Sequence, residues 1–95
     1  MAKSSLERLQ AIVYGRVQGV SFRFYTRDTA MALGLTGWVA NRYDGSVEVV
    51  AEGARAQLDE LLSFLYQGPS MARVDQVQFD YLPATREFKR FTIEG

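Results

Sequence analysis

The chain of 95 residues contains neither cysteine nor histidine, which excludes disulfides, thiolate metal sites, cysteine nucleophiles and any mechanism that needs an imidazole. Eleven basic and eleven acidic side chains leave no net charge, so a basic surface for nucleic-acid phosphates is not expected. Apolar residues make up 47% of the chain, which predicts one compact domain over residues 1–95. No segment reaches the roughly 20 apolar residues of a membrane span, and residues 1–10 lack a signal-peptide pattern, so we expect a cytoplasmic protein.

The first third of the chain predicts a strand, a loop and a helix. Residues Leu9–Tyr14 alternate as a strand does, and a loop from Gly15 to Val20 follows. Ser21 is the expected N-cap of the helix, and Gly34 suits the left-handed turn that ends one. Between them, these residues recur at helical spacing: Phe22, Tyr25 or Thr26, Thr29 and Leu33.

The middle of the chain predicts a hairpin followed by a second helix. Two strands, Thr36–Arg42 and Ser46–Glu52, are joined by Asp44-Gly45, a strong hairpin signal. The segment Ala54–Gln67 places leucines at positions i, i+3, i+4 and i+7, which is typical of an amphipathic helix. Gly68-Pro69 ends that helix.

Two further strands complete the predicted order. They are Val74–Tyr81, with a bulge near Asp75 or Gln76 where the apolar parity shifts, and Phe88–Ile93. The central hairpin leaves a gap in the sheet that another strand must fill. The order therefore predicts an α+β, ferredoxin-like split β-α-β sandwich: an antiparallel sheet of four to five strands with two helices on one face. Core or partly buried packing is expected for Trp38, Phe22, Phe24, Tyr25, Phe64, Phe79 and Phe91.

The loop that connects the first strand to the first helix has the features of an anion site. Backbone N–H groups at a helix start have no partner within the helix, and the helix dipole favours negative charge there. Consecutive loop amides can surround phosphate oxygens where residues adopt positive φ, and Gly15 and Gly19 do so readily. A plain connection between two elements has the same pattern, so both interpretations stay open on this feature alone.

Two polar side chains near that loop have both a functional and an ordinary interpretation. Arg23 lies in the first helical turn, where a cation opposes the helix dipole unless an anion binds beside it. Its planar donors match a phosphoryl group, yet a surface arginine paired with Asp28 or a strand carboxylate fits equally well. Asn41 precedes the hairpin and could hold a water by donating and accepting at once, or simply occupy a turn.

Two segments resemble the signatures of the acylphosphatase family. Residues 13–23 read V-Y-G-R-V-Q-G-V-S-F-R, which is similar to the first signature of that family. Residues 37–47 read G-W-V-A-N-R-Y-D-G-S-V, with Gly53 six residues further on, and resemble the second. The resemblance covers nearly the whole chain, and Arg23 and Asn41 stand at the matching positions.

The resemblance implies hydrolysis of the carboxyl-phosphate bond of acyl phosphates to a carboxylate and inorganic phosphate, by in-line attack of water. It implies that Arg23 binds the phosphoryl oxygens and that Asn41 positions the water. We also expect a monomer that works with no metal and no cofactor. The phosphate would be held by backbone amides, with side chains acting only through loop shape, at Arg16, Val17, Gln18, Gly19 and Val20.

That chemistry suits a chain with so few reactive groups. The leaving carboxylate has a pKa near ~4, so it needs no general acid at neutral pH. Phosphoryl transfer spreads charge over three equatorial oxygens, which amides and one guanidinium can stabilise. A metal site is not expected, because the paired carboxylates Asp75 and Asp80, and Glu48 and Glu52, lie on strands away from the loop.

Other functions remain to be weighed against hydrolysis. A ferredoxin-like RNA-binding domain would stack bases on aromatic residues of central strands, but Ser46–Gly53 has none. A phosphate-binding module without turnover, a narrower substrate such as carbamoyl phosphate, and service to a protein partner fit the same sequence.

Overall fold

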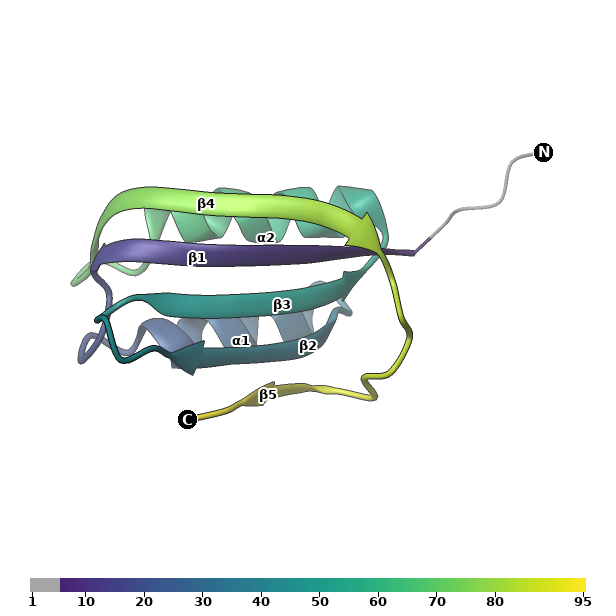
Figure 1. The fold of residues 1–95 in the computed structure, drawn as a ribbon, viewed down its shortest axis with the longest axis horizontal. Helices are drawn as coiled ribbons and strands as arrows, with labels where there is room; N and C mark the ends of the chain where they lie inside the picture. The colour runs from purple at the N-terminus through teal and green to yellow at the C-terminus, as the bar shows by residue number, and fades with distance from the viewer. Residues whose placement is uncertain (1–5) are drawn as a thin grey trace.

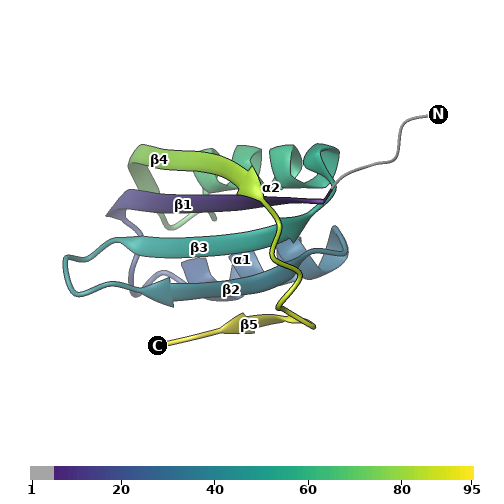
Figure 2. The same cartoon turned by 45° about the vertical axis from the view of Figure 1, so that its right-hand side comes forward.

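The computed structural model describes residues 6–95, which form one five-stranded sheet with two helices packed on the same face (Figures 1 and 2). The strand order is β4-β1-β3-β2-β5. The elements in chain order are β1 (Glu7–Arg16), α1 (Phe22–Ala32), β2 (Thr36–Asn41), β3 (Val47–Gly53), α2 (Arg55–Gln67), β4 (Arg73–Pro83) and β5 (Phe91–Ile93).

The predicted fold is confirmed, and the fifth strand adds one parallel pair to it. The antiparallel β3 lies between β1 and β2, which is the split arrangement, and β4 pairs antiparallel with the other edge of β1. The short β5 instead pairs parallel with β2, with Gly37 opposite Phe91, so the sheet is mixed rather than wholly antiparallel. The reason is visible in Figure 1: after β4 the chain crosses the end of the sheet and returns along the edge of β2.

The bulge expected near Asp75 or Gln76 is confirmed. Tyr14 pairs with Gln76 and Gly15 pairs with Val74, so Asp75 is the extra residue on β4. Gly15 has a φ of 134°, and a Cβ at this position would lie 2.1 Å from the carbonyl oxygen of Arg73 (a backbone contact that glycine alone allows). The bulge twists the end of β1, which continues to Arg16 before the chain turns into the loop.

The two helices begin and end close to the predicted residues, with one physical difference. Ser21 is the N-cap of α1, but its φ of 62° is left-handed and its side chain makes no capping hydrogen bond. Gly34, at φ 74°, provides the left-handed turn after α1 as predicted. The buried residues of the helices that face the sheet are Phe22, Thr26 and Ala30 on α1, and Leu58, Leu61 and Leu65 on α2.

Burial of the aromatic residues follows the prediction only in part. Phe22 and Phe91 are in the core, whereas Phe24, Tyr25 and Phe79 are 51%, 52% and 41% exposed, so the prediction of packing was wrong for these three. Phe24 and Tyr25 lie in the first turn of α1, on the sides that do not face the sheet. Phe79 lies on β4, which forms an edge of the sheet with no strand beyond it.

A buried carboxylate holds the connection between β4 and β5. The side chain of Glu52 is nearly inaccessible, and its Oε2 accepts hydrogen bonds from Arg8 Nε at 2.8 Å and from the Thr85 amide at 2.9 Å. Its Oε1 accepts the Arg86 amide at 2.9 Å. These bonds fix the path that brings β5 to the edge of β2.

We expect Glu52 to make stability depend on acid pH. Burial alone would raise the pKa of Glu52, but the hydrogen bonds from Thr85, Arg8 and Arg86 outweigh burial and hold that pKa below 4.5. The stabilisation is therefore present above about pH 4.5 and is lost as pH falls through the lower folded-state value. Glu52→Gln should lose about 3 kcal/mol of unfolding free energy at pH 7 in urea titrations. That deficit should shrink at pH 3, and an equal deficit at both pH values would contradict this role.

Candidate active site

The β1–α1 loop (residues 17–21), the start of α1 and the end of β2 meet at one end of the sheet, on the left in Figure 1. A pocket of about 220 Å³ lies between them. It is lined by Val17, Gly19, Ser21, Phe22, Arg23, Phe24 and Asn41. The predicted arginine and asparagine, 18 positions apart in the chain, thus border one cavity together with part of the glycine-containing loop.

The amides of the β1–α1 loop are available as donors. Gly19 and Ser21 both have positive φ, 75° and 62°, a conformation that a serine adopts only under constraint. Within residues 6–95, the N–H groups of residues 17–20 donate to no backbone or side-chain acceptor. The first helical bond runs from the Tyr25 amide to the Ser21 carbonyl at 3.1 Å, so the amides at the start of α1 precede the helical ladder as well. Such a set of donors suits an anion.

The guanidinium of Arg23 pairs with no Asp or Glu side chain among the described residues. Its Nη1 donates to the main-chain oxygen of Gly95 at 2.6 Å, which brings the segment after β5 to the pocket. Asp28, the expected alternative partner, is instead paired with Arg27 at 3.2 Å. The interpretation of Arg23 as half of a surface ion pair with Asp28 is therefore wrong, and its guanidinium contacts the main chain of Gly95 instead.

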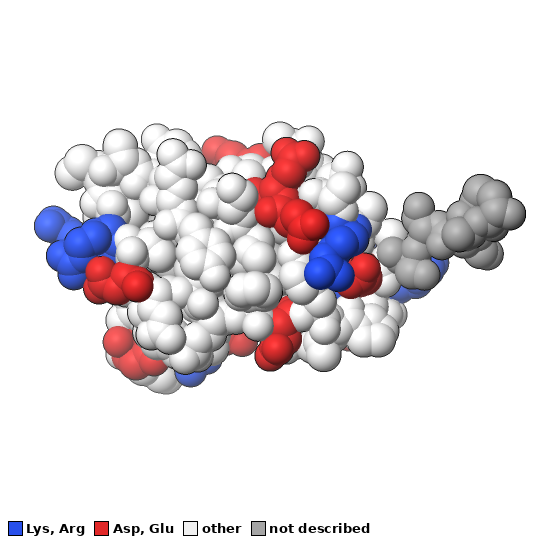
Figure 3. Space-filling model, turned by 90° about the horizontal axis from the view of Figure 1, so that it is seen from above, with Lys and Arg blue, Asp and Glu red and all other residues white. Residues whose placement is uncertain are grey.

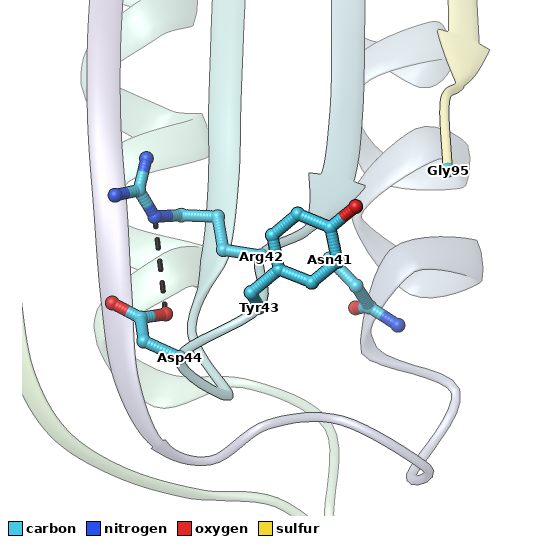
Figure 4. Close-up of a pocket in the computed structure, with 5 residues that line it drawn as sticks. All are labelled: Asn41, Arg42, Tyr43, Asp44 and Gly95. Carbon is cyan, nitrogen blue, oxygen red and sulfur yellow. Dashed lines mark ion pairs between the residues drawn. The ribbon is translucent and has the colours of Figure 1, made fainter.

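Asn41 brings an unpaired acceptor to the pocket. It is the last residue of β2, opposite Val47, and its Oδ1 is buried with no hydrogen-bond partner in the described part of the chain. Figure 4 shows its side chain pointing away from the hairpin, toward the β1–α1 loop and the start of α1. An unsatisfied buried acceptor costs about 1–3 kcal/mol, so a site that keeps one is suited to a donor such as water.

The predicted loop residues differ in which cavity they line. Val17 and Gly19 line the pocket with Arg23. Arg16 and Val20 instead border a cavity of about 290 Å³ on the other side of the loop, beside Met71. Gln18 lines neither of these cavities.

The side chain of Gln18 has a contact that sequence reasoning missed. Its Nε2 donates to the carbonyl oxygens of Arg42 at 2.8 Å and Ser46 at 2.9 Å, on the two sides of the β2–β3 hairpin. The expectation that this residue contributes only its backbone was therefore incomplete. A long amide side chain between two glycines, in a loop where small residues would serve, is the signal that could have found it.

The hairpin itself is held by hydrogen bonds and ion pairs. Asp44 Oδ1 accepts hydrogen bonds from the hydroxyl and the amide of Ser46, and these bonds hold the pKa of Asp44 below its usual range. Arg42 contacts Glu48 at 3.2 Å and Asp44 at 3.9 Å (Figure 4). Beside the hairpin, Asn41 and Tyr43 border a larger open cavity of about 710 Å³.

The described residues do not form the features expected for a metal site, a membrane span or, on the face drawn in Figure 3, a basic nucleic-acid surface. They contain no group of three or more metal-ligating acidic, cysteine or histidine residues, and no helix among them has the length and apolar character of a membrane span. On the face seen in Figure 3, basic and acidic side chains of the described residues lie in small, separate groups rather than in a continuous basic patch.

Comparison with known proteins agrees with the fold and shows the family. The family profile described as Acylphosphatase matches residues 9–93. An acylphosphatase of Pelotomaculum thermopropionicum is 48% identical over 94% of this chain and 97% of its own length, and one of Pasteurella multocida is 52% identical over 88% and 93%. The crystal structure of acylphosphatase from Bacillus subtilis superimposes with a TM-score of 0.90 at 34% identity, covering 94% of this chain and 99% of that one.

A small ferredoxin-like domain with a loop of unpaired amides at one sheet end is thus the class of protein that fold and site define together. The chain belongs to the acylphosphatase family, and it is a hydrolase. The family supports acyl phosphates as its substrates.

Proposed function

We propose that this chain hydrolyses the carboxyl-phosphate bond of acyl phosphates to a carboxylate and inorganic phosphate by in-line attack of water. The amides of residues 16–20 and the guanidinium of Arg23 hold the phosphoryl oxygens, and Asn41 positions the water. The proposal includes a single domain that acts as a cytoplasmic monomer and needs neither a metal ion nor a cofactor.

One observation carries this proposal. In the part of the chain that the structure describes, three kinds of group surround the same end of the sheet: amides without acceptors, a guanidinium paired with no Asp or Glu side chain, and an amide oxygen without a donor. The first two match the charge that develops on the equatorial oxygens of a phosphoryl group in transfer. The third can accept a hydrogen from a water while the Asn41 amide nitrogen donates elsewhere.

The test is the release of phosphate from benzoyl phosphate, with and without a chelator. We expect turnover that survives the chelator, and competitive inhibition by inorganic phosphate, because phosphate occupies the same loop as the substrate. Binding of phosphate without any turnover would favour a phosphate-binding module instead. Turnover abolished by the chelator and restored by a divalent cation would contradict the metal-independent mechanism.

Asn41→Ala should lower kcat by about 10²-fold, since a poorly placed nucleophile costs about that much. The inhibition constant of inorganic phosphate should stay close to that of the wild-type chain, because the loop and Arg23 hold phosphate. Steady-state kinetics with benzoyl phosphate and phosphate inhibition measure both quantities. Weaker phosphate binding with unchanged kcat would place Asn41 on the phosphate rather than on the water.

A further inference from the structure

We propose that the side-chain amide of Gln18 is a positioning residue, which sets Asn41, and the water that it holds, at the right distance from the phosphoryl group. The inference rests on the proposed function. It adds to that function the contact that holds the phosphate-binding loop and Asn41 in a fixed relative position. The phosphate-holding groups lie on the β1–α1 loop and α1, whereas Asn41 lies on β2, a separate strand that β3 keeps apart from β1.

The geometry of the contact supports this role. Gln18 Nε2 donates to Arg42 O at 2.8 Å and to Ser46 O at 2.9 Å. Arg42 directly follows Asn41 in the chain, and Ser46 directly precedes Val47, the residue that pairs with Asn41 in the sheet. The amide nitrogen of Gln18 is thus bonded both to the residue after Asn41 and to the residue before its cross-strand partner.

The two carbonyl groups can accept these bonds in addition to those of the hairpin. Ser46 O already accepts the Arg42 amide at 2.8 Å, and Arg42 O accepts the Gly45 amide at 3.2 Å. A carbonyl oxygen has two lone pairs, so each receives one hydrogen from the hairpin and one from Gln18. The hairpin therefore closes by its own bonds, and the bonds from Gln18 serve to attach it to the loop.

Glutamine is the side chain that fits this contact. It provides two N–H donors on one nitrogen at the end of a three-bond side chain, and no net charge beside the anion site. Asparagine has one methylene fewer, and a carboxylate offers acceptors to two carbonyl oxygens and is repelled by them. The hairpin that Gln18 contacts is itself held in shape, because the amide and the hydroxyl of Ser46 both donate hydrogen bonds to Asp44.

A double-mutant cycle tests whether Gln18 acts through Asn41. Gln18→Met, which keeps the length and removes the donors, should lower kcat for benzoyl phosphate about 10-fold and leave phosphate inhibition unchanged. In the Asn41→Ala background the same substitution should change kcat less than about twofold, because the positioned group is gone. Gln67→Met, at an exposed position on α2, is the matched control and should leave both quantities as in the wild-type chain.

The dependence of kcat on pH provides a second measurement, which would not change if Gln18 only stabilised the fold. In Gln18→Glu the introduced carboxyl faces two carbonyl oxygens, so its pKa rises, and once protonated it can donate one hydrogen bond. The ratio of its kcat to that of the wild-type chain should rise as pH falls from 7 to 5, while Gln18→Met shows a flat ratio.

Two results would overturn the inference: an equal loss of kcat from Gln18→Met in both backgrounds, or a flat ratio for Gln18→Glu. A loss of kcat that only follows the fraction of unfolded chain in circular dichroism would also overturn it. Failure of the proposed function is distinguishable from these, since it would appear as no turnover by the wild-type chain itself.

Discussion

Arg23→Ala should lose at least ~10²-fold in kcat with benzoyl phosphate, the loss typical of removing one donor to a developing oxyanion. Arg23 is the one pocket-lining side chain with a full positive charge, and among the described residues no Asp or Glu side chain neutralises it. Inorganic phosphate should also inhibit the variant more weakly, since the guanidinium binds product as well as transition state. Initial rates and phosphate inhibition measure both effects.

The matched control for this substitution is Arg27→Ala. Arg27 lies one helical turn further along α1 and pairs with Asp28 at the surface, so its removal takes the same charge from the same helix. Arg27 does not line the pocket, although its guanidinium lies 5.4 Å from the ring centroid of Phe24, which does. We expect near-normal kinetics from Arg27→Ala. If Arg23→Ala retains wild-type rates, or if both variants lose activity equally, Arg23 has only a general electrostatic effect. Arg23→Lys should fall between the wild-type chain and Arg23→Ala, because lysine keeps the charge but loses the planar pair of donors.

Gly37→Ala should lower the free energy of unfolding by at least about 3 kcal/mol. Gly37 lies in β2 with a φ of 138°, and a Cβ there would stand 1.9 Å from the carbonyl oxygen of Val50 on β3. Neither backbone can withdraw, because Gly37 pairs with Ala51 on one side and with Phe91 on the other. Urea titration monitored by circular dichroism measures the loss, which is a large share of the 5–15 kcal/mol typical of a domain.

Gly34→Ala separates the two causes of that loss. Gly34 also has a positive φ, 74°, but a Cβ there would meet nothing within 4 Å. Its substitution should therefore cost only the left-handed backbone strain, about 1–2 kcal/mol. Equal losses from the two substitutions would show that backbone conformation, rather than the contact with Val50, determines the cost at Gly37.

The fold could be predicted from the sequence because its signals are local. Alternation in β3, the leucine spacing of α2 and the Asp44-Gly45 turn each depend on a few neighbouring residues. The parity shift in β4 even predicted a bulge near Asp75 or Gln76, and the extra residue is Asp75. The parallel pairing of β5 was not predictable in this way, because it depends on how Glu52 holds the preceding connection, a contact between residues more than 30 positions apart.

The motifs predicted which single residues border the pocket. They did not predict contacts that depend on how separate elements are placed relative to one another. Arg23 and Asn41 border one pocket as the motifs indicate. The exposure of Phe24 and the contact of Gln18 with the hairpin depend on how α1 and β2 are placed at the end of the sheet. Ser21 illustrates the limit: its position as N-cap was predictable, but its left-handed backbone was not, because serine usually caps through its side chain.

The pairing of β5 with β2 has a practical consequence for handling this enzyme. Gly95 lies within hydrogen-bond reach of Arg23, whereas the start of β1 lies at the opposite end of the sheet (Figure 1). An affinity tag or fusion partner joined after Gly95 would begin beside Arg23, at the border of the proposed site. Attachment through the start of β1, at the opposite end of the sheet in Figure 1, would keep the tag away from Arg23 and Asn41.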